Sequence, residues 1–278
     1  GWGPDAVVQT ILDAVANLQA DPALTAADVR SVGIGIPGRI EPGSGRVEHA
    51  VNLGVETLDL AAAVAPVLGV PVRVENDVKA AALGAASLRG GTLSMGYLNL
   101  GTGIAAAIVT GGVLWRGARG GAGEIGHLSI DPAGPVCRCG QRGCIEALAG
   151  GGAVSARWGR PGALPIRDVF DAADGGDAAA VLVRTDLARG VAAAIRVLVL
   201  TADVDTVVLG GGITALGTRL QSEVAAQLEA SARESAFLRS LQLVDRVEIL
   251  PAGAPAAALG AALIGTEAAD EREVLSHG

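Results

Sequence analysis

Short apolar segments that end in glycine turns alternate with helix-forming segments along much of this chain. Residues 29–38, VRSVGIGIPG, are typical of a strand that runs into a turn at Pro37 and Gly38. Residues 71–75, PVRVE, are typical of a second strand, and residues 77–89 then have the composition of a helix. Strands that alternate with helices in this way favour an α/β fold.

The remaining segments extend this pattern into two blocks. Helices are expected at residues 4–19, where apolar side chains recur on one face, and at 60–68, which Asp59 is placed to cap. The other expected strands are residues 96–117, which form two or three strands joined by glycine turns, and the buried strands 204–212 and 247–250. Residues 151–180 show little periodicity and are expected to be helix and loop. The two blocks predict two lobes with a boundary near residues 84–92.

The composition excludes several classes of protein. With 278 residues, half of them hydrophobic, the chain can bury a sizeable core. A net charge of -8, a single lysine (Lys79) and 2% aromatic residues argue against a nucleic-acid surface and against a ring platform for sugars. Apolar runs such as residues 191–200 are shorter than the roughly 20 residues of a membrane span, and no signal-peptide pattern is present. We therefore expect a cytoplasmic protein without membrane contact.

All three cysteines of the chain lie within eight residues, at Cys137, Cys139 and Cys144, and His127 precedes them. Three thiolates and one imidazole form one of the closed tetrahedral sets that zinc (Zn²⁺) prefers. The alternatives are three buried thiols with an unrelated histidine, or a disulfide with one spare cysteine. A disulfide fits poorly with an odd count in a cytosolic chain, so a structural zinc site is the favoured interpretation.

Acidic side chains flank this cluster and also follow the strand at 71–75. Glu124 and Glu146 bracket the cysteines, and rigid carboxylates suit a ligand rich in hydroxyl groups. The alternative is two solvated surface glutamates. Asn76 and Asp77 lie where a strand meets a helix, a position at which open α/β sheets bind ligands, and Asp77 would suit a general base. The alternative is that Asp77 only caps the helix.

Two glycine turns follow predicted strands, LGTGIAAA at residues 100–107 and LGGGIT at 209–214. Successive backbone N–H groups in such turns can bind phosphate without any lysine. The first turn also matches a dinucleotide fingerprint, but the chain continues as strand and hairpin instead of opening a helix, which excludes that interpretation. Lys79 and Asn52 lie near these predicted ligand loops, where surface and turn roles are at least as plausible.

Six motifs occur in the order and at about the spacing of the ROK family, which comprises bacterial sugar kinases and sugar-responsive repressors. They are SVGIGIPG, VRVENDVKAAALG, LNLGTGIAAAI, GAGEIGHLSIDPAG, CRCGQRGCIE and VVLGGGI, and the match to the family runs from about residue 31 to 265. The chain therefore resembles this family over most of its length. The resemblance implies the two-lobed, ribonuclease H-like fold of the actin-like ATPases, with a first lobe of residues 1–88, completed by the helix 256–278, and a second lobe of 89–255 that contains the zinc loop 127–144.

The resemblance also implies a role for each motif. A sugar would be surrounded by Asn76, Asp77, Glu124, His127 and Glu146, with Asp77 taking the proton from its primary hydroxyl as that group attacks the γ-phosphate of ATP. Zinc would be held by His127, Cys137, Cys139 and Cys144. Gly101, Thr102 and Gly103 resemble a phosphate turn, and Gly210, Gly211 and Gly212 an adenosine turn. Mg²⁺ would accompany ATP, and members of the family are commonly homo-oligomers.

Two departures from the family pattern bear on function. Kinases of the family begin with an Asp-x-Gly-Gly-Thr phosphate turn, and no such turn is present, so we expect the first strands of the first lobe to lie upstream of Gly1. A lobe without these strands should be marginally folded, and restoring them should raise yield and melting temperature. The second departure is a pair of alanines, Ala105 and Ala106, where kinases of the family more often have glycines. Methyl groups at these positions would crowd the phosphate path, because glycine is what permits a close approach of the backbone.

These observations leave three functions open. An ATP-dependent kinase that phosphorylates a hexose, either glucose-like or an N-acetylhexosamine, is the leading hypothesis. A sugar-sensing transcriptional repressor with an upstream helix-turn-helix is the alternative, and in that case DNA would be bound by the upstream domain. A non-catalytic sugar-binding protein is the third. Some members of the family use polyphosphate in place of ATP as the phosphate donor.

Overall fold

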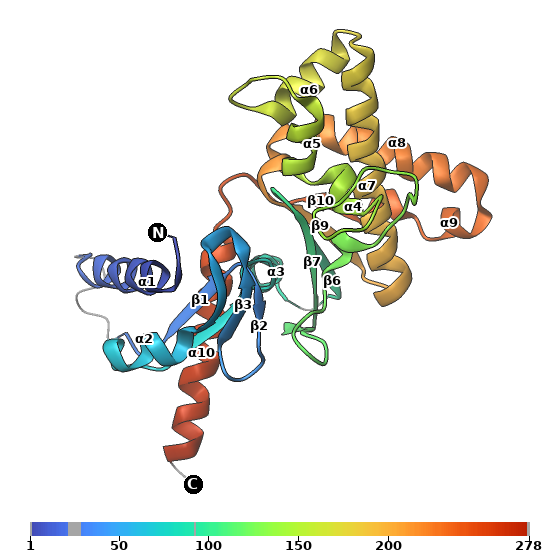
Figure 1. The fold of residues 1–278 in the computed structure, drawn as a ribbon. Coiled ribbons are helices and arrows are strands. Elements are labelled where there is room, and N and C mark those ends of the chain that lie inside the picture. Colours follow the sequence, from blue (N-terminus) through green and yellow to red (C-terminus); the bar gives the residue numbers. More distant parts are fainter. Residues whose placement is uncertain (1, 22–28, 92, 277–278) are drawn as a thin grey trace. The chain divides into compact units, whose positions relative to one another are not determined.

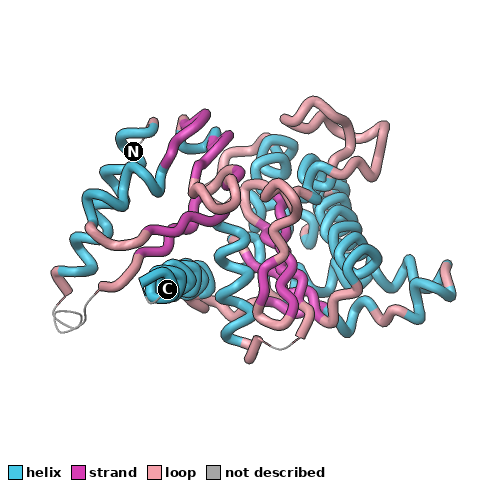
Figure 2. Tube along the Cα trace, turned by 90° about the horizontal axis from the view of Figure 1, so that it is seen from below, coloured by secondary structure: helices cyan, strands magenta, loops and turns pink. Residues whose placement is uncertain are grey.

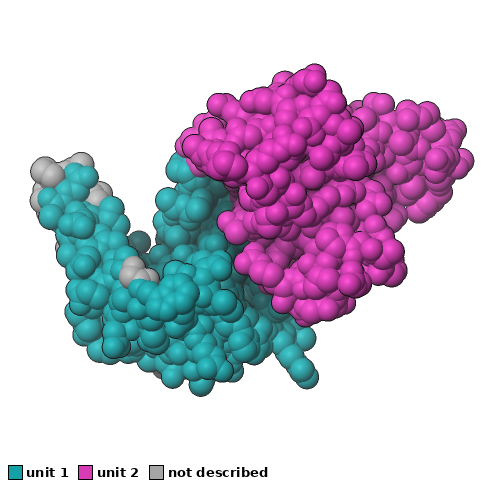
Figure 3. Space-filling view, turned by 45° about the horizontal axis from the view of Figure 1, so that its top comes forward, with its two compact units in different colours: residues 1–91, 112–122, 255–278 teal, residues 92–111, 123–254 magenta. Residues whose placement is uncertain are grey.

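The structure, a computed structural model, describes residues 2–21, 29–91 and 93–276. The chain forms two compact units, which Figure 3 colours separately. Unit 1 contains residues 1–91, 112–122 and 255–278, and unit 2 contains residues 92–111 and 123–254. Both units combine helices with strands, which confirms the predicted α/β class.

Two parallel strands and two helices form one part of unit 1. Strand β1 (Val32–Ile36) pairs in parallel with β5 (Val72–Asn76), as predicted, from Val32 opposite Val72 to Ile36 opposite Asn76. Helix α3 (Asp77–Leu88) and helix α10 (Ala256–Ser276) pack on each other, and α10 also packs on β1 (Figure 1). Residues 277–278 of the predicted C-terminal helix lie outside the described residues. The helices approach closely because Gly84 and Gly260 have no β-carbon, which would meet the backbone of the opposite helix.

Unit 1 also contains an antiparallel sheet that the sequence analysis did not predict. Its strands are β2 (Arg39–Ile40), β3 (Arg46–Ala50) and β4 (Val55–Asp59), with β3 in the centre. A short 3₁₀ helix, η1 (Val51–Leu53), joins β3 to β4. Buried side chains of this sheet share one hydrophobic core with helices α1 (Pro4–Gln19) and α2 (Leu60–Leu68).

The predicted cap of α2 is wrong. Asp59 occupies the N-cap position, but its side chain accepts no hydrogen bond from the helix. It lies instead 3.7 Å from the guanidinium Nε of Arg46 on the neighbouring strand. An ion pair with β3 therefore replaces the expected cap.

Unit 2 contributes four strands of a five-stranded sheet, in the order β10, β9, β6 and β7. Strands β6 (Met95–Leu100) and β7 (Ile104–Thr110) form the predicted hairpin, and the chain then continues through Gly111 and Gly112 into β8 (Val113–Leu114). Strand β9 (Thr206–Gly210) is parallel to β6 and entirely buried, as expected. The prediction of a buried strand at 247–250 is wrong in part. Strand β10 (Val247–Ile249) is only half-buried because it lies at the edge of the sheet.

Helices of unit 2 lie along one side of these strands (Figure 2). The longest, α7 (Ala178–Ala202), contributes twelve buried residues, and its neighbours pack around it. These neighbours are α4 (Ile145–Ala149), α5 (Gly151–Trp158), α6 (Pro165–Asp174) and α8 (Thr218–Glu234), and α9 (Ala236–Ser240) packs on α8. Three 3₁₀ turns complete the unit, namely η2 (Ile125–His127), η3 (Gly212–Leu216) and η4 (Leu243–Arg246). Among the described residues, no helix combines the length and the apolar content needed to cross a bilayer.

Candidate functional site

The four predicted metal ligands lie together in unit 2. One ligand atom from each of His127, Cys137, Cys139 and Cys144 lies within 4.8 Å of the others. The Sγ atoms of Cys139 and Cys144 are 3.6 Å apart, far beyond the ~2.05 Å of a disulfide bond, and all three cysteines are free. Cys137 and Cys144 are buried, which matches a closed site with three sulfur donors and one nitrogen donor.

The loop shifts the pKa values of two of its thiols in opposite directions. The backbone and side chain of Gln141 lower the pKa of the Cys139 thiol to about 6, and Gln141 Nε2 lies 3.5 Å from Cys139 Sγ. Burial raises the pKa of the Cys144 thiol to about 12. The two thiols therefore differ in how readily they lose the proton that a metal ligand must release.

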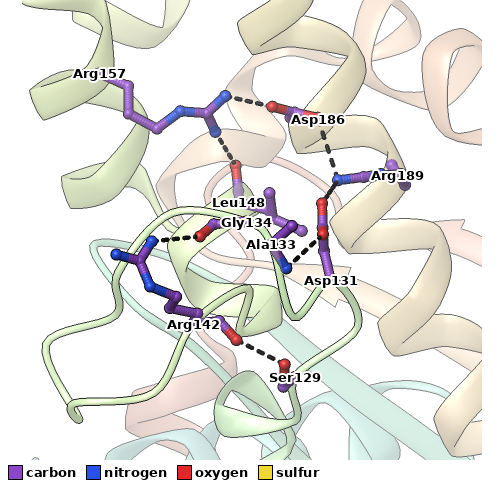
Figure 4. A network of polar contacts seen from close by, with 9 residues as sticks. All are labelled: Ser129, Asp131, Ala133, Gly134, Arg142, Leu148, Arg157, Asp186 and Arg189. Carbon is purple, nitrogen blue, oxygen red and sulfur yellow. Dashed lines mark hydrogen bonds and ion pairs between the residues drawn. The ribbon is translucent and has the colours of Figure 1, made fainter.

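A network of polar contacts holds the loop to the helices of unit 2 (Figure 4). Asp131 accepts hydrogen bonds from the N–H of Ala133 at 3.2 Å and from Arg189 of α7 at 2.9 Å. Ser129 donates to the carbonyl oxygen of Arg142 at 2.6 Å, which closes the base of the loop. This network uses none of the four metal-ligand side chains, so it fixes the loop independently of them.

The junction between β5 and α3 in unit 1 carries Asn76 and Asp77. The helix cap is Asn76, whose Oδ1 accepts hydrogen bonds from the N–H groups of Val78 and Lys79 at 3.0 and 3.2 Å. Asn76 Nδ2 also donates to the carbonyl oxygen of Gly38 at 3.0 Å, which leaves one N–H of this amide for a ligand. Asp77 is the first residue of the helix, and burial raises the pKa of its carboxyl group, against backbone N–H contacts that lower it.

Two buried charged side chains flank this junction and bind the strap, which we define as residues 112–122. Glu75 is 5% exposed and accepts hydrogen bonds from the Nε of Arg116 at 2.7 Å and from the N–H of Asn76 at 2.9 Å. Lys79 is also 5% exposed, and its Nζ donates to the carbonyl oxygen of Gly120. The surface role considered for Lys79 is therefore wrong. The sequence revealed neither of these two contacts of the strap, because each joins residues about forty positions apart in the chain.

The two glycine turns contribute to one cavity of about 530 Å³ within unit 2. Gly101 and Thr102 of the first turn and Gly212 of the second line it, whereas Gly103, Gly210 and Gly211 do not. Part of its wall was not predicted. This part is apolar and comes from Leu164 and Ile166 around the start of α6, and from Ile213 and Leu216 of η3. A cavity of this size with one polar end suits a nucleotide-sized ligand.

A second cavity, of about 380 Å³, shares Thr102 and Gly152 with the first. Glu146 lines it together with Arg138 of the zinc loop. Neither Ala105 nor Ala106 occurs among the residues that line these two cavities, and both lie in strand β7.

Glu146 binds the first glycine turn directly. Its Oε2 accepts a hydrogen bond from the N–H of Ile104 at 3.0 Å. A β-carbon on Gly103 would lie 2.5 Å from the same oxygen, so glycine is needed there for the carboxylate to approach. Glu146 is therefore only half-exposed, whereas Glu124, just before η2, is exposed.

The predicted sugar contacts fall into two groups. Glu124, His127 and Glu146 belong to unit 2, while Asn76 and Asp77 belong to unit 1. Asn52, which was also considered, is an exposed residue of η1.

Comparison with known proteins identifies the family. The profile of the ROK family matches residues 3–267. The chain belongs to the ROK family. A glucokinase from Halalkalibacterium halodurans is 31% identical over 245 residues, which cover 81% of this chain and 74% of that protein. An N-acetylmannosamine kinase from Escherichia coli is 33% identical over 219 residues, which cover 76% of this chain and 71% of that protein.

Solved structures of the ROK family share the fold. A ROK hexokinase from Thermus thermophilus superposes with a TM-score of 0.78 at 30% identity, over 97% of this chain and 88% of that one. A ROK family transcriptional regulator superposes with a TM-score of 0.73 at 28% identity, over 96% of this chain and 69% of that one. The likeness confirms the predicted actin-like ATPase fold and the resemblance drawn from the motifs.

Proposed function

We propose that this ROK protein is a sugar kinase that transfers the γ-phosphate of ATP to a primary hydroxyl of a hexose, either glucose-like or an N-acetylhexosamine. The observation that carries the proposal is the cavity of about 530 Å³, which two glycine turns line together at Gly101, Thr102 and Gly212. A kinase needs a site for its nucleotide, and a cavity of this size can hold one. Similarity to a glucokinase and to an N-acetylmannosamine kinase supports the same reaction.

Asp77 acts as the general base in this proposal. Its pKa is raised by burial, so its carboxylate accepts a proton more readily than an exposed aspartate does. Its Oδ1 already accepts the N–H of Val78 at 3.0 Å, which fixes the orientation of the carboxylate and leaves Oδ2 for the hydroxyl of the acceptor. Neighbouring Asn76 offers its remaining N–H to a second hydroxyl.

Glu124, His127 and Glu146 bind the other hydroxyl groups of the sugar. His127, Cys137, Cys139 and Cys144 hold zinc, and their three sulfur donors and one nitrogen donor leave the metal no open position. The role of the metal is thus to order the loop, and with it the imidazole of His127. None of the chemical steps requires zinc.

The nucleotide occupies the larger cavity. Its phosphates lie on the backbone of the turn at Thr102, and its adenosine lies against the apolar wall that includes Leu164 and Ile213. Magnesium, bound with ATP, would neutralise charge on the phosphates. Ala105 and Ala106 do not line this cavity, so the expected crowding of the phosphate path gives no reason to exclude catalysis.

The second candidate function is a sugar-sensing repressor. The observation in its favour is the likeness to a ROK transcriptional regulator over 96% of this chain. In that case a DNA-binding domain would belong to a longer protein, and sugar would bind without turnover.

A coupled ADP-release assay separates these two functions. The full-length natural protein is incubated with Mg-ATP and with a panel of hexoses and N-acetylhexosamines. The proposal predicts ADP release that depends on one sugar or a few. If calorimetry detects sugar binding but no member of the panel stimulates ADP release, the kinase assignment fails and the repressor is favoured.

A further inference from the structure

The second cavity of unit 2 contains an arginine that no described residue neutralises. Arg138 lies between the metal ligands Cys137 and Cys139 and is exposed. No hydrogen bond or ion pair joins its guanidinium group to any other residue in the described part of the chain. The other arginine of this cavity, Arg157, is instead paired with Asp186 and also donates to the carbonyl oxygen of Leu148. Arg138 therefore supplies the free positive charge of the cavity.

The guanidinium group of Arg138 approaches the first glycine turn at Gly152. A β-carbon placed on Gly152 would lie 3.2 Å from Thr102 Cγ2 and 3.5 Å from Arg138 Nη2. The N–H of Gly152 also donates to the carbonyl oxygen of Thr102 at 2.9 Å. Arg138 and Thr102 thus border the same small space, which the absence of a side chain at Gly152 keeps open.

Thr102 and Gly152 line both cavities, so the two spaces meet at the turn. Glu146 also lines the second cavity. A phosphate chain that enters along the larger cavity and crosses Thr102 therefore ends beside Arg138.

We propose that Arg138 binds the terminal phosphoryl group of the phosphate donor and stabilises its charge during transfer. This inference rests on the proposed function. In the reaction, a bond forms between the acceptor oxygen and the γ-phosphorus, and the bond from that phosphorus to the β–γ bridging oxygen breaks. ADP leaves with the electron pair, and the proton of the acceptor goes to Asp77. Arg138 exchanges no proton, and its planar fork pairs with two phosphoryl oxygens.

The positive charge that binds phosphate at this site comes from an arginine and not from a lysine. The one lysine of the chain, Lys79, is buried in unit 1 and donates to the backbone of the strap. Charge stabilisation by arginine contributes strongly to phosphoryl transfer, since the transferring group spreads negative charge over three oxygens. The position of Arg138 between two cysteines also gives the zinc loop a second role, because the backbone of Arg138 is then fixed on both sides.

The test compares Arg138→Gln with Arg142→Gln by calorimetry with tripolyphosphate. Arg142 is an exposed arginine of the same loop, it donates to the carbonyl oxygen of Gly134 at 3.3 Å, and it does not line the cavity, so it is the matched control. A hydrogen bond to a charged group is worth about 1.5–3 kcal/mol, so Arg138→Gln should weaken tripolyphosphate binding about 10- to 100-fold. Arg142→Gln should bind like the wild type. In the sugar kinase assay, kcat should fall in Arg138→Gln while the KM for sugar is unchanged.

Bound zinc is measured in each variant, and Arg138→Lys is added to keep the charge without the fork. We expect Arg138→Lys to recover part of the affinity for tripolyphosphate, and we expect all variants to bind as much zinc as the wild type. Equal affinity of Arg138→Gln and the wild type overturns the inference, as does a failure of the wild type to bind tripolyphosphate. A loss in Arg138→Gln that accompanies loss of zinc and is not recovered by lysine also overturns it. If no sugar is phosphorylated but the Arg138 dependence of tripolyphosphate binding is found, only the kinase assignment fails.

Discussion

Removing the guanidinium group that faces Glu75 should destabilise unit 1 by a predictable amount. In Arg116→Gln, the carboxylate of Glu75, whose side chain is 7% exposed, loses a charged partner at 2.7 Å. Breaking a fully buried pair costs about 3–5 kcal/mol, whereas an exposed pair is worth about 0–1 kcal/mol. The side chain of Arg116 is 34% exposed, so we expect an intermediate loss of about 1–3 kcal/mol in the free energy of unfolding. At about 3 °C for each kcal/mol, the melting temperature should fall by about 3–9 °C.

A double-mutant cycle measures the pair itself. Thermal and urea unfolding, followed by circular dichroism, are compared for Glu75→Gln, Arg116→Gln and the double variant. The double variant should be more stable than the sum of the two losses predicts, because it leaves no unpaired buried charge. Arg119→Gln is the control, since Arg119 is an exposed arginine of the same strap, and it should unfold like the wild type. Additivity of the two single losses to within about 0.5 kcal/mol would refute the reasoning.

Three further changes test the site. Because burial raises the pKa of Asp77, the folded protein holds this proton more tightly than the unfolded chain does, and its stability should fall as pH rises from the ordinary aspartate pKa to the raised one. Asp77→Asn should therefore melt at a higher temperature than the wild type at pH 7, and a lower melting temperature would contradict this. Gly103→Ala should displace Glu146 from the N–H of Ile104 and raise the Kd for sugar, measured by calorimetry with Mg-ATP absent. Cys139→Ser should release zinc, measured by metal analysis, and weaken sugar binding; unchanged sugar affinity in the metal-free variant would exclude an ordering role for the metal.

Elements with a strong local pattern were predictable from the sequence. Strand β5, helix α3 and the β6–β7 hairpin follow from apolar runs and from the turns between them. The sheet of β2, β3 and β4 was missed, because β2 has only two residues and β3 mixes charged side chains with the buried Val47 and Ala50. The two buried residues are three positions apart, so β3 lacks the alternation of a regular half-buried strand, and His49 between them has a φ of 56°. The half-exposed state of β10 depends on its place at the edge of the sheet, which no local pattern reveals.

In the candidate site, too, local patterns were predictable from the sequence and contacts between distant segments were not. The four metal ligands were predictable because they lie in one short loop and zinc chemistry fixes their number and type. The burial of Lys79 was not predictable, since its partner is the backbone of Gly120 in the strap. The role of Arg138 was also hidden, because its cavity is completed by Thr102 and Gly152 from other segments of unit 2. Contacts between distant segments thus account for what the sequence analysis missed.

The most direct test of the account measures binding and turnover in the same protein. Sugar binding is measured by calorimetry, and formation of sugar phosphate is followed by ³¹P nuclear magnetic resonance, for the wild type and for Asp77→Asn. Loss of a general base should lower the rate about 10²- to 10⁴-fold, whereas the Kd for sugar should stay within about threefold, because asparagine still fits the site and can hydrogen-bond a hydroxyl. Sugar phosphate formed by Asp77→Asn at the wild-type rate would contradict the assignment of Asp77 as the base.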